Sequence, residues 1–165
     1  MKKQKGFSLI ELLIVVAIIL IIAAIAIPNL LRSKMAANES SAVGSIRTIN
    51  TAMVTYASSY PDTGYAAALL NLGGPVGACA AGTLGTTAQA CLIDPILSSS
   101  NKSGYTFTAV GLVKGAGVVK NVFTATAKPQ GIGTTGQRGF FSDESGVIRY
   151  TLDGTVPTVA SSPLQ

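Results

Sequence analysis

An apolar run near the N-terminus, interrupted by one carboxylate, constrains this 165-residue chain more than any other feature. From Leu9 to Ile27, every one of the 19 residues except Glu11 is apolar. As a helix rising about 1.5 Å per residue, this run spans about 28 Å, close to the hydrocarbon thickness of a bilayer. Because the run is apolar on every side, lipid or a bundle of similar helices must cover all of it.

Basic residues before such a run are typical of either a signal peptide or a membrane anchor, and residues 1–6 include three lysines. An A-x-A motif ending at Ala26 permits cleavage by an ordinary signal peptidase, which would leave Ile27 as the mature N-terminus. However, the run exceeds the roughly 7–15 residues of a secretory apolar region. A carboxylate within a spanning helix also costs about 2.5–3.5 kcal/mol, and a discarded leader has no use for Glu11. We therefore predict a retained helix.

The segment around Glu11 resembles the N-terminus of type IV prepilins and of the related type II secretion pseudopilins. The residues that carry the resemblance are Lys5-Gly6-Phe7-Ser8-Leu9-Ile10-Glu11-Leu12-Leu13-Ile14-Val15-Val16-Ala17-Ile18 and Ala26-Ile27-Pro28. The resemblance implies that a prepilin peptidase cuts between Gly6 and Phe7 and N-methylates Phe7. It also implies that Glu11 is the assembly glutamate and that Pro28 is the proline that bends the helix.

Cleavage before Phe7 would change the charge balance of this segment. The Phe7 nitrogen is an uncharged amide in the precursor and becomes an amine with a pKa of about 8, hence largely cationic at neutral pH. This amine can pair with Glu11 of the same helix or of a neighbouring subunit. Because an unpaired carboxylate is costly at low dielectric, pairing between chains would favour polymerisation. The alternative is that Glu11 only snorkels to the membrane surface.

Beyond Pro28 the sequence becomes amphipathic, which predicts that the helix continues to about Ser59. The apolar residues that recur at threes and fours are Leu31, Met35, Ala42, Val43, Ile46, Ile49, Met53, Tyr56, Ala57 and Tyr60. A bend or local loosening is expected at Pro28 because proline lacks an N–H group. The turn-forming residues 60–64 end the helix. Since the whole helix is longer than a membrane requires, its second half is expected to lie along a globular domain.

Residues 61–104 are rich in Gly, Ala, Ser and Thr and predict an irregular connection, with a short helix around 65–70. Both cysteines, Cys79 and Cys91, lie within it. In an exported chain they are expected to form a disulfide that stabilises the fold by about 3 kcal/mol, the alternative being two free thiols. A zinc site is disfavoured because the chain has no histidine.

Strand signals come last in the chain. Residues 105–113 and 117–127 predict one antiparallel hairpin, and residues 139–142 and 147–151 predict a second, followed by a coil at 153–165. The predicted fold class is α+β: a pilin fold in which the amphipathic helix covers a roughly four-stranded antiparallel sheet. The predicted segments are a leader at 1–6, an apolar helix at 7–28, an amphipathic helix at 29–60, a loop region at 61–104, a sheet at 105–152 and a tail at 153–165.

An enzymatic role has little support because the chain has no histidine and no recognisable pairing of nucleophile and base. Asp143 and Glu144, together with Asp153, offer oxygen ligands for calcium, but an ordinary hairpin turn accounts for the same residues. No other cofactor is predicted. No basic cluster with interleaved aromatic residues favours nucleic-acid binding, and nothing indicates a small-molecule partner. Asn38 and Asn101 begin glycosylation-like triplets, which are weak motifs.

These features predict a structural subunit, a major pilin, that polymerises through its N-terminal helix into a filament for adhesion, motility or DNA uptake. The alternatives are a major pseudopilin of a type II secretion system and a membrane-anchored binding module that does not polymerise. The resemblance implies a prepilin peptidase, an assembly ATPase and a membrane platform protein as partners. It also implies a precursor in the bacterial inner membrane, with a cytoplasmic N-terminus, and a filament in the periplasm or at the cell surface.

Overall fold

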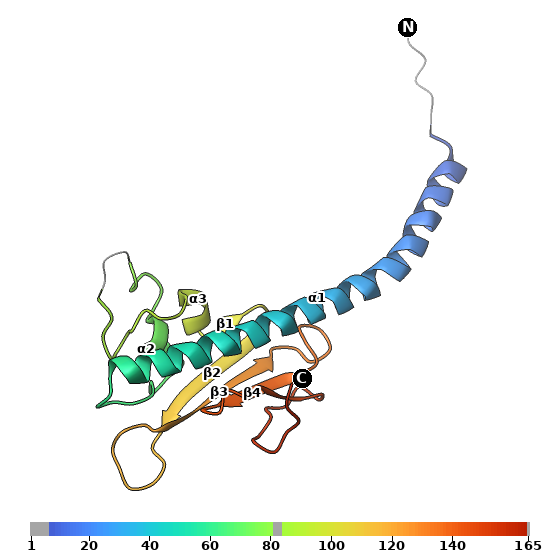
Figure 1. Cartoon of the computed structure of the whole chain (residues 1–165). Helices are drawn as coiled ribbons and strands as arrows, with labels where there is room; N and C mark the ends of the chain where they lie inside the picture. The colour runs from blue at the N-terminus through green and yellow to red at the C-terminus, as the bar shows by residue number, and fades with distance from the viewer. Residues whose placement is uncertain (1–6, 81–83, 165) are drawn as a thin grey trace. The chain divides into compact units, whose positions relative to one another are not determined.

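A computed structural model of the chain describes residues 7–80 and 84–164 (Figure 1). The elements in chain order are α1 (Leu9–Ser59), α2 (Leu69–Gly73), α3 (Pro95–Ser98), β1 (Asn101–Lys102), β2 (Tyr105–Leu112), β3 (Val122–Pro129), β4 (Gly139–Asp143) and β5 (Arg149–Thr151). The chain divides into two compact units, Met1–Lys34 and Met35–Gln165. We describe each unit by itself.

The described part of the first unit is mainly the N-terminal half of α1, which contains several Leu and Ala residues that favour a helix and no glycine. The helix is continuous at Pro28, so the predicted loosening does not interrupt it. Apolar side chains point outward along the whole segment; Leu9, Leu20 and Ile27, for example, are each more than half exposed. This half of α1 therefore has no internal core.

The second unit contains an antiparallel sheet of five strands in the order β1-β2-β3-β4-β5, in place of the roughly four strands that we predicted. The additional strand, β1, pairs Asn101 with Thr106 and lies within the segment predicted as loop. A two-residue strand has no alternating pattern, so the sequence carries no signal for it. The other strands follow the predicted hairpins, although β3 begins only at Val122 because residues 117–121 belong to the preceding loop.

Two short helices lie in the segment 61–104. The predicted helix around residues 65–70 is displaced to α2 at Leu69–Gly73. Helix α3, whose N-cap is Asp94 and whose first turn contains Pro95, is not among the predicted elements. The Leu97 N–H donates to Asp94 Oδ1 at 2.8 Å. An Asp-Pro pair at a helix start is a recognised signal that was present in the sequence.

The core of the second unit lies between the C-terminal half of α1 and one face of the sheet, as Figure 1 shows. The predicted helix end at Ser59 is confirmed. The largest fully buried apolar side chains are Ile46, Ile49, Met53, Tyr56, Leu72, Leu97, Tyr105, Phe107, Phe123 and Phe140. Burying each aliphatic or phenyl side chain contributes about 1.5–3 kcal/mol. The amphipathic half of α1 is therefore held by the sheet, as predicted.

The segment predicted as a coil tail, 153–165, does not run free of the sheet. The Tyr150 N–H donates to the Ser162 carbonyl at 3.0 Å, and the Leu164 N–H donates to the Ile148 carbonyl at 2.7 Å. The end of the tail thus pairs with the outer edge of β5. Covering an edge strand in this way removes a site for unwanted pairing between sheets.

Candidate functional site

The start of α1 positions the carboxylate of Glu11, the predicted assembly residue. The Ser8 N–H donates to Glu11 Oε2 at 3.0 Å, and the Leu12 N–H donates to the Ser8 carbonyl at 3.2 Å. This contact is half of a capping box, in which the side chain of the third helical residue, here Glu11, accepts from the N–H of the residue before the helix, here Ser8. Within one chain, the partner of Glu11 is therefore its own helix start. Ser8 is not among the predicted site residues, although its S-x-x-E spacing with Glu11 is a signal for a helix start.

The predicted processing site adjoins this helix start. Phe7, four residues before Glu11, is 77% exposed. Gly6 lies outside the described residues, so cleavage between Gly6 and Phe7 and N-methylation of Phe7 stay predictions. A free amine at Phe7 would carry its charge next to the capped Glu11 carboxylate.

The apolar half of α1 gives this site its second property, an uncharged and uncovered surface. From Leu12 to Leu31 there is no ionisable side chain. The helix is long and apolar enough to cross a membrane, and its most apolar window, of mean hydropathy 3.3, has no residue buried within the chain. Such a surface can partition into a bilayer or pack into a bundle of like helices. Because each large side chain that leaves water gains about 1.5–3 kcal/mol, either environment is strongly favoured over water.

A second carboxylate of α1, Glu39, joins the helix to the sheet. Glu39 Oε2 accepts from Arg138 Nε at 2.8 Å, while its Oε1 accepts from the backbone N–H groups of Gln137 at 2.8 Å and of Arg138 at 3.0 Å. The Arg138 guanidinium also lies over the rings of Phe140 and Tyr150, 5.6 and 5.7 Å from their centroids. Glu39 is one of the polar residues between the recurring apolar positions of α1, so the amphipathic pattern gave no indication that it is buried.

The environment of Glu39 changes its acidity. Burial by itself would raise the pKa of Glu39, but the N–H donors of Gln137 and Arg138 and the Arg138 guanidinium together lower it below its ordinary value. The carboxylate thus stays ionised although it is 8% exposed. The partners lie 98 and 99 residues away along the chain, so no local pattern could have indicated them.

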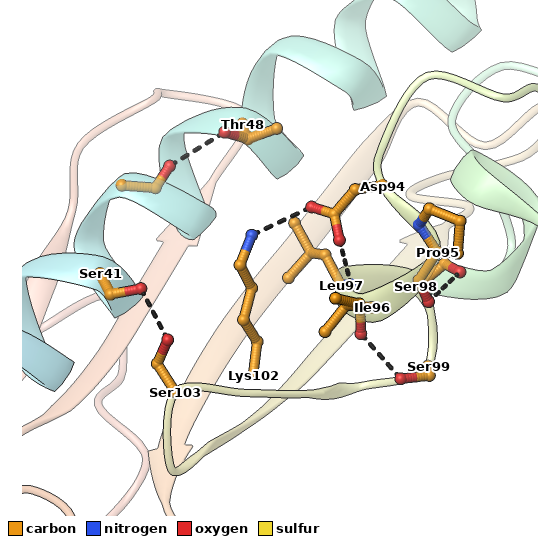
Figure 2. Close-up of polar contacts among 11 residues, drawn as sticks. Ser41, Thr48, Asp94, Pro95, Ile96, Leu97, Ser98, Ser99, Lys102 and Ser103 are labelled. Carbon is orange, nitrogen blue, oxygen red and sulfur yellow. Dashed lines mark hydrogen bonds and ion pairs between the residues drawn. The ribbon is translucent and has the colours of Figure 1, made fainter. Parts of the chain in front are cut away.

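Polar contacts also join α1, α3 and the β1–β2 turn, and Figure 2 shows them. Ser41 Oγ donates to Ser103 Oγ at 3.0 Å, and Lys102 Nζ pairs with Asp94 Oδ2 at 3.0 Å. Burial acts to raise the pKa of Asp94, but the Leu97 N–H and Lys102 lower it overall. Exposed pairs of this kind contribute at most about 1 kcal/mol. They orient the loop region rather than stabilise the unit strongly.

The disulfide predicted from the sequence is present. Cys79 and Cys91 are bonded, with their Cα atoms 5.5 Å apart and 12 positions of separation along the chain. The loop that they close returns to the core, since the Tyr56 hydroxyl donates to the Thr87 carbonyl at 2.7 Å. The disulfide therefore holds a long irregular segment against the end of α1.

The acidic residues proposed for calcium sit in separate turns. Asp143 Oδ1 accepts from the Ser145 N–H at 3.0 Å, and Asp153 Oδ1 accepts from the Thr155 N–H at 3.1 Å, which are ordinary turn contacts. Glu144 is exposed. Over residues 7–80 and 84–164, no group of three or more His, Cys, Asp or Glu side chains is placed to hold a metal. Calcium binding here stays a prediction.

Comparisons with known proteins give one family match at the N-terminus and several partial matches to relatives. Residues 1–27 match the protein family described as "Prokaryotic N-terminal methylation motif". The chain is 62% identical over 39 residues to the type IV wide pilus major component PilA4 of Thermus thermophilus, covering 24% of this chain and 30% of that protein. It is 45% identical over 54 residues to the type IV major pilin protein PilA of Myxococcus xanthus, covering 33% of this chain and 24% of that protein.

A longer match includes part of the globular unit. Over 106 residues the chain is 30% identical to the type II secretion system core protein G of Escherichia coli, covering 62% of this chain and 61% of that protein. The matched segments therefore span from about a quarter to about three fifths of these relatives. No solved structure is significantly similar to the chain.

Proposed function

Because the chain carries the prokaryotic N-terminal methylation motif and is homologous to type IV pilins and to type II secretion core protein G, we propose that it is the major subunit of a type IV pilus-like filament. One observation carries this proposal: an uncovered, uncharged helix surface begins directly after the capped carboxylate of Glu11. A subunit that must leave the bilayer and enter a bundle of like helices needs such a surface. Its role is structural rather than enzymatic.

Processing sets up assembly. A prepilin peptidase cuts between Gly6 and Phe7 and N-methylates Phe7, which stays basic and carries a positive charge at neutral pH. In the precursor, Glu11 has the Ser8 N–H as its partner. After cleavage, the Phe7 amine of a neighbouring chain offers the same carboxylate a full charge, which at low dielectric is the stronger partner.

This exchange of partners would set the register between neighbouring helices. A chain whose Glu11 faces apolar side chains in the bundle is disfavoured, while one whose Glu11 meets a Phe7 amine is stabilised. An assembly ATPase and a membrane platform protein supply the work of extracting the helix from the inner membrane. The finished filament lies in the periplasm or at the cell surface, where it serves adhesion, motility or DNA uptake.

A major pseudopilin is the second candidate, and the extent of the homology favours it. The match to core protein G covers 106 residues, whereas the matches to the pilins of Thermus and Myxococcus cover 39 and 54. The chemistry proposed for Phe7 and Glu11 is the same in both cases. The two candidates differ in where the filament ends and in what its loss affects.

Substitution of Glu11 tests the assembly step. Glu11→Ala and Glu11→Gln are expected to be processed normally, which the mass of an N-terminus beginning at methylated Phe7 will show. Both should reduce the filament yield at least tenfold, because the neighbouring amine loses its counter-charge in a site of low dielectric. Asp62→Asn, which removes an exposed carboxylate from the turn after α1, is the matched control and should assemble normally.

The same series separates the alternatives. Abundant filaments from Glu11→Ala would contradict the proposed pairing and would favour a carboxylate that merely snorkels. A parent chain that is processed yet stays monomeric under every condition would instead indicate a membrane-anchored binding module. Gly6→Ala should be tolerated, whereas Gly6→Asp should leave the precursor uncut if cleavage occurs after Gly6.

A further inference from the structure

The loop between β2 and β3 displays apolar side chains to solvent. It projects beyond the end of the sheet as the amber loop in Figure 1. Val118 is 89% exposed, and Val113 and Leu112 are 43% and 46% exposed. Exposed apolar side chains gathered at one place often mark a binding surface. We call residues 112–120 the tip loop.

The base of the tip loop is held by defined contacts. The Asn121 side chain bridges it, accepting from the Lys114 N–H at 2.7 Å and donating to the Lys114 carbonyl at 2.9 Å. On the other side, the Lys120 N–H donates to the Thr63 carbonyl at 3.2 Å, and the Lys120 carbonyl accepts from the Tyr65 N–H at 2.9 Å. The backbone therefore holds both lysines in place while their side chains remain available.

The tip loop itself carries only positive charges. Between Asp94 and Asp143 the sequence contains no carboxylate, and Lys114 and Lys120 flank the apolar tip. Over the described ranges 7–80 and 84–164, the ion pairs are Lys102–Asp94 and Arg138–Glu39, so neither lysine of the tip loop is neutralised by a salt bridge. The backbone contact between Lys120 and Thr63 brings one acidic residue, Asp62, near the base of the loop, because Asp62 directly precedes Thr63.

We propose that the tip loop docks on an anionic lipid surface. Val118 enters the boundary between headgroups and acyl chains, and Lys114 and Lys120 contact lipid phosphates. The apolar tip matches the acyl chains of such a surface and the flanking cations match its phosphates, while residues 112–120 contain no carboxylate that would be repelled. Two lysines beside an anionic bilayer favour the docked state by roughly thirtyfold. One loop alone binds weakly, but a chain anchored by α1, or many copies in a filament, raises the effective concentration.

The absence of tryptophan from the chain permits a direct test. Val118→Trp places a single fluorescent reporter at the tip. The full chain would be reconstituted through its apolar helix into vesicles of phosphatidylcholine alone or with phosphatidylglycerol. Brominated lipid, which quenches tryptophan on contact, is placed in the same bilayer in one arm and in added vesicles in the other. Val159→Trp, at a position 63% exposed on the C-terminal tail, is the matched control.

We expect the emission of the Val118→Trp variant to shift to shorter wavelength and to be quenched in at least one arm, and only with the anionic lipid. Adding Lys114→Gln and Lys120→Gln to that variant should abolish the lipid dependence, since the contacts at the base of the loop use only backbone groups of the two lysines. The Val159→Trp control should not respond. No quenching in either arm, or equal quenching with both lipids, would overturn the proposal. A blue shift that grows with the number of protein copies per vesicle, without quenching by brominated lipid, would also overturn the proposal. That result would indicate docking between copies of the chain.

Discussion

The two carboxylates of α1 have different roles because their surroundings differ. Glu11 accepts one hydrogen bond, from the Ser8 N–H, and faces the surface of the chain. Glu39 accepts from two backbone N–H groups and from the Arg138 guanidinium, all contributed by the segment before β4. The single contact of Glu11 leaves its carboxylate accessible to another partner, whereas the three contacts of Glu39 hold its carboxylate within the folded unit. A residue type alone does not distinguish these roles.

Removing Glu39 should destabilise the globular unit. Glu39→Ala leaves Arg138 without its partner and is expected to cost about 3 kcal/mol at pH 7, measured by denaturant unfolding of the full chain in detergent. Glu39→Gln keeps the side-chain volume and an acceptor oxygen but loses the charge, so a smaller loss of about 1–2 kcal/mol is expected.

The pH dependence of this loss has a definite sign. Because the folded pKa of Glu39 lies below its ordinary value of 4.5, its stabilisation is present above that value and is lost as the pH falls through the folded pKa. The difference in unfolding free energy between the parent and Glu39→Gln should therefore shrink as the pH drops below 4.5. A difference that stays constant to pH 3 would show that the charge of Glu39 does not act in this way.

At the scale of elements, α1 is one continuous helix whose two halves have different surfaces. Its first half is apolar on all sides, and its second half buries one face against the sheet. Pro28 lies in the first half without ending the helix. The loop region 61–104 gains its order differently, through the disulfide and through hydrogen bonds to α1 and α2, because it has little regular structure of its own.

Loss of the disulfide should lower the stability of the fold and expose mainly this loop region to proteolysis. Replacing Cys79 and Cys91 together with serine is expected to cost about 3 kcal/mol, since the closed loop is short, and to lower the Tm by roughly 10 °C. Proteolysis should then cut first within residues 74–92. Ser99→Ala, which changes an exposed hydroxyl of the same region, is the control. An unchanged Tm would show that the contacts of Tyr56 and α2 hold the loop without the bond.

At the scale of the whole molecule, the proposed pilus and pseudopilus lead to different consequences in the cell. Deletion of the chain should remove long surface filaments seen by electron microscopy if it is a pilus subunit, with secretion unchanged. If it is a pseudopilin, deletion should instead leave exported proteins in the periplasm, without loss of surface filaments. The Glu11→Ala chain should reproduce whichever defect the deletion gives, because both roles require assembly.

Local features of the sequence determined much of this protein. The apolar run indicated the exposed helix, the turn-forming residues 60–64 located the helix end at Ser59, and the β-branched segments located both hairpins. These signals arise between near neighbours in the sequence. The predicted disulfide between Cys79 and Cys91 is confirmed.

The tertiary structure alone decided the rest. It buried Glu39 against Arg138, added β1 to the sheet edge and returned the tail to β5. Each of these depends on groups that folding brings together, in the case of Glu39 from 99 positions away. Their energies come from desolvation and from backbone groups on other elements, and neither leaves a periodic pattern in the sequence.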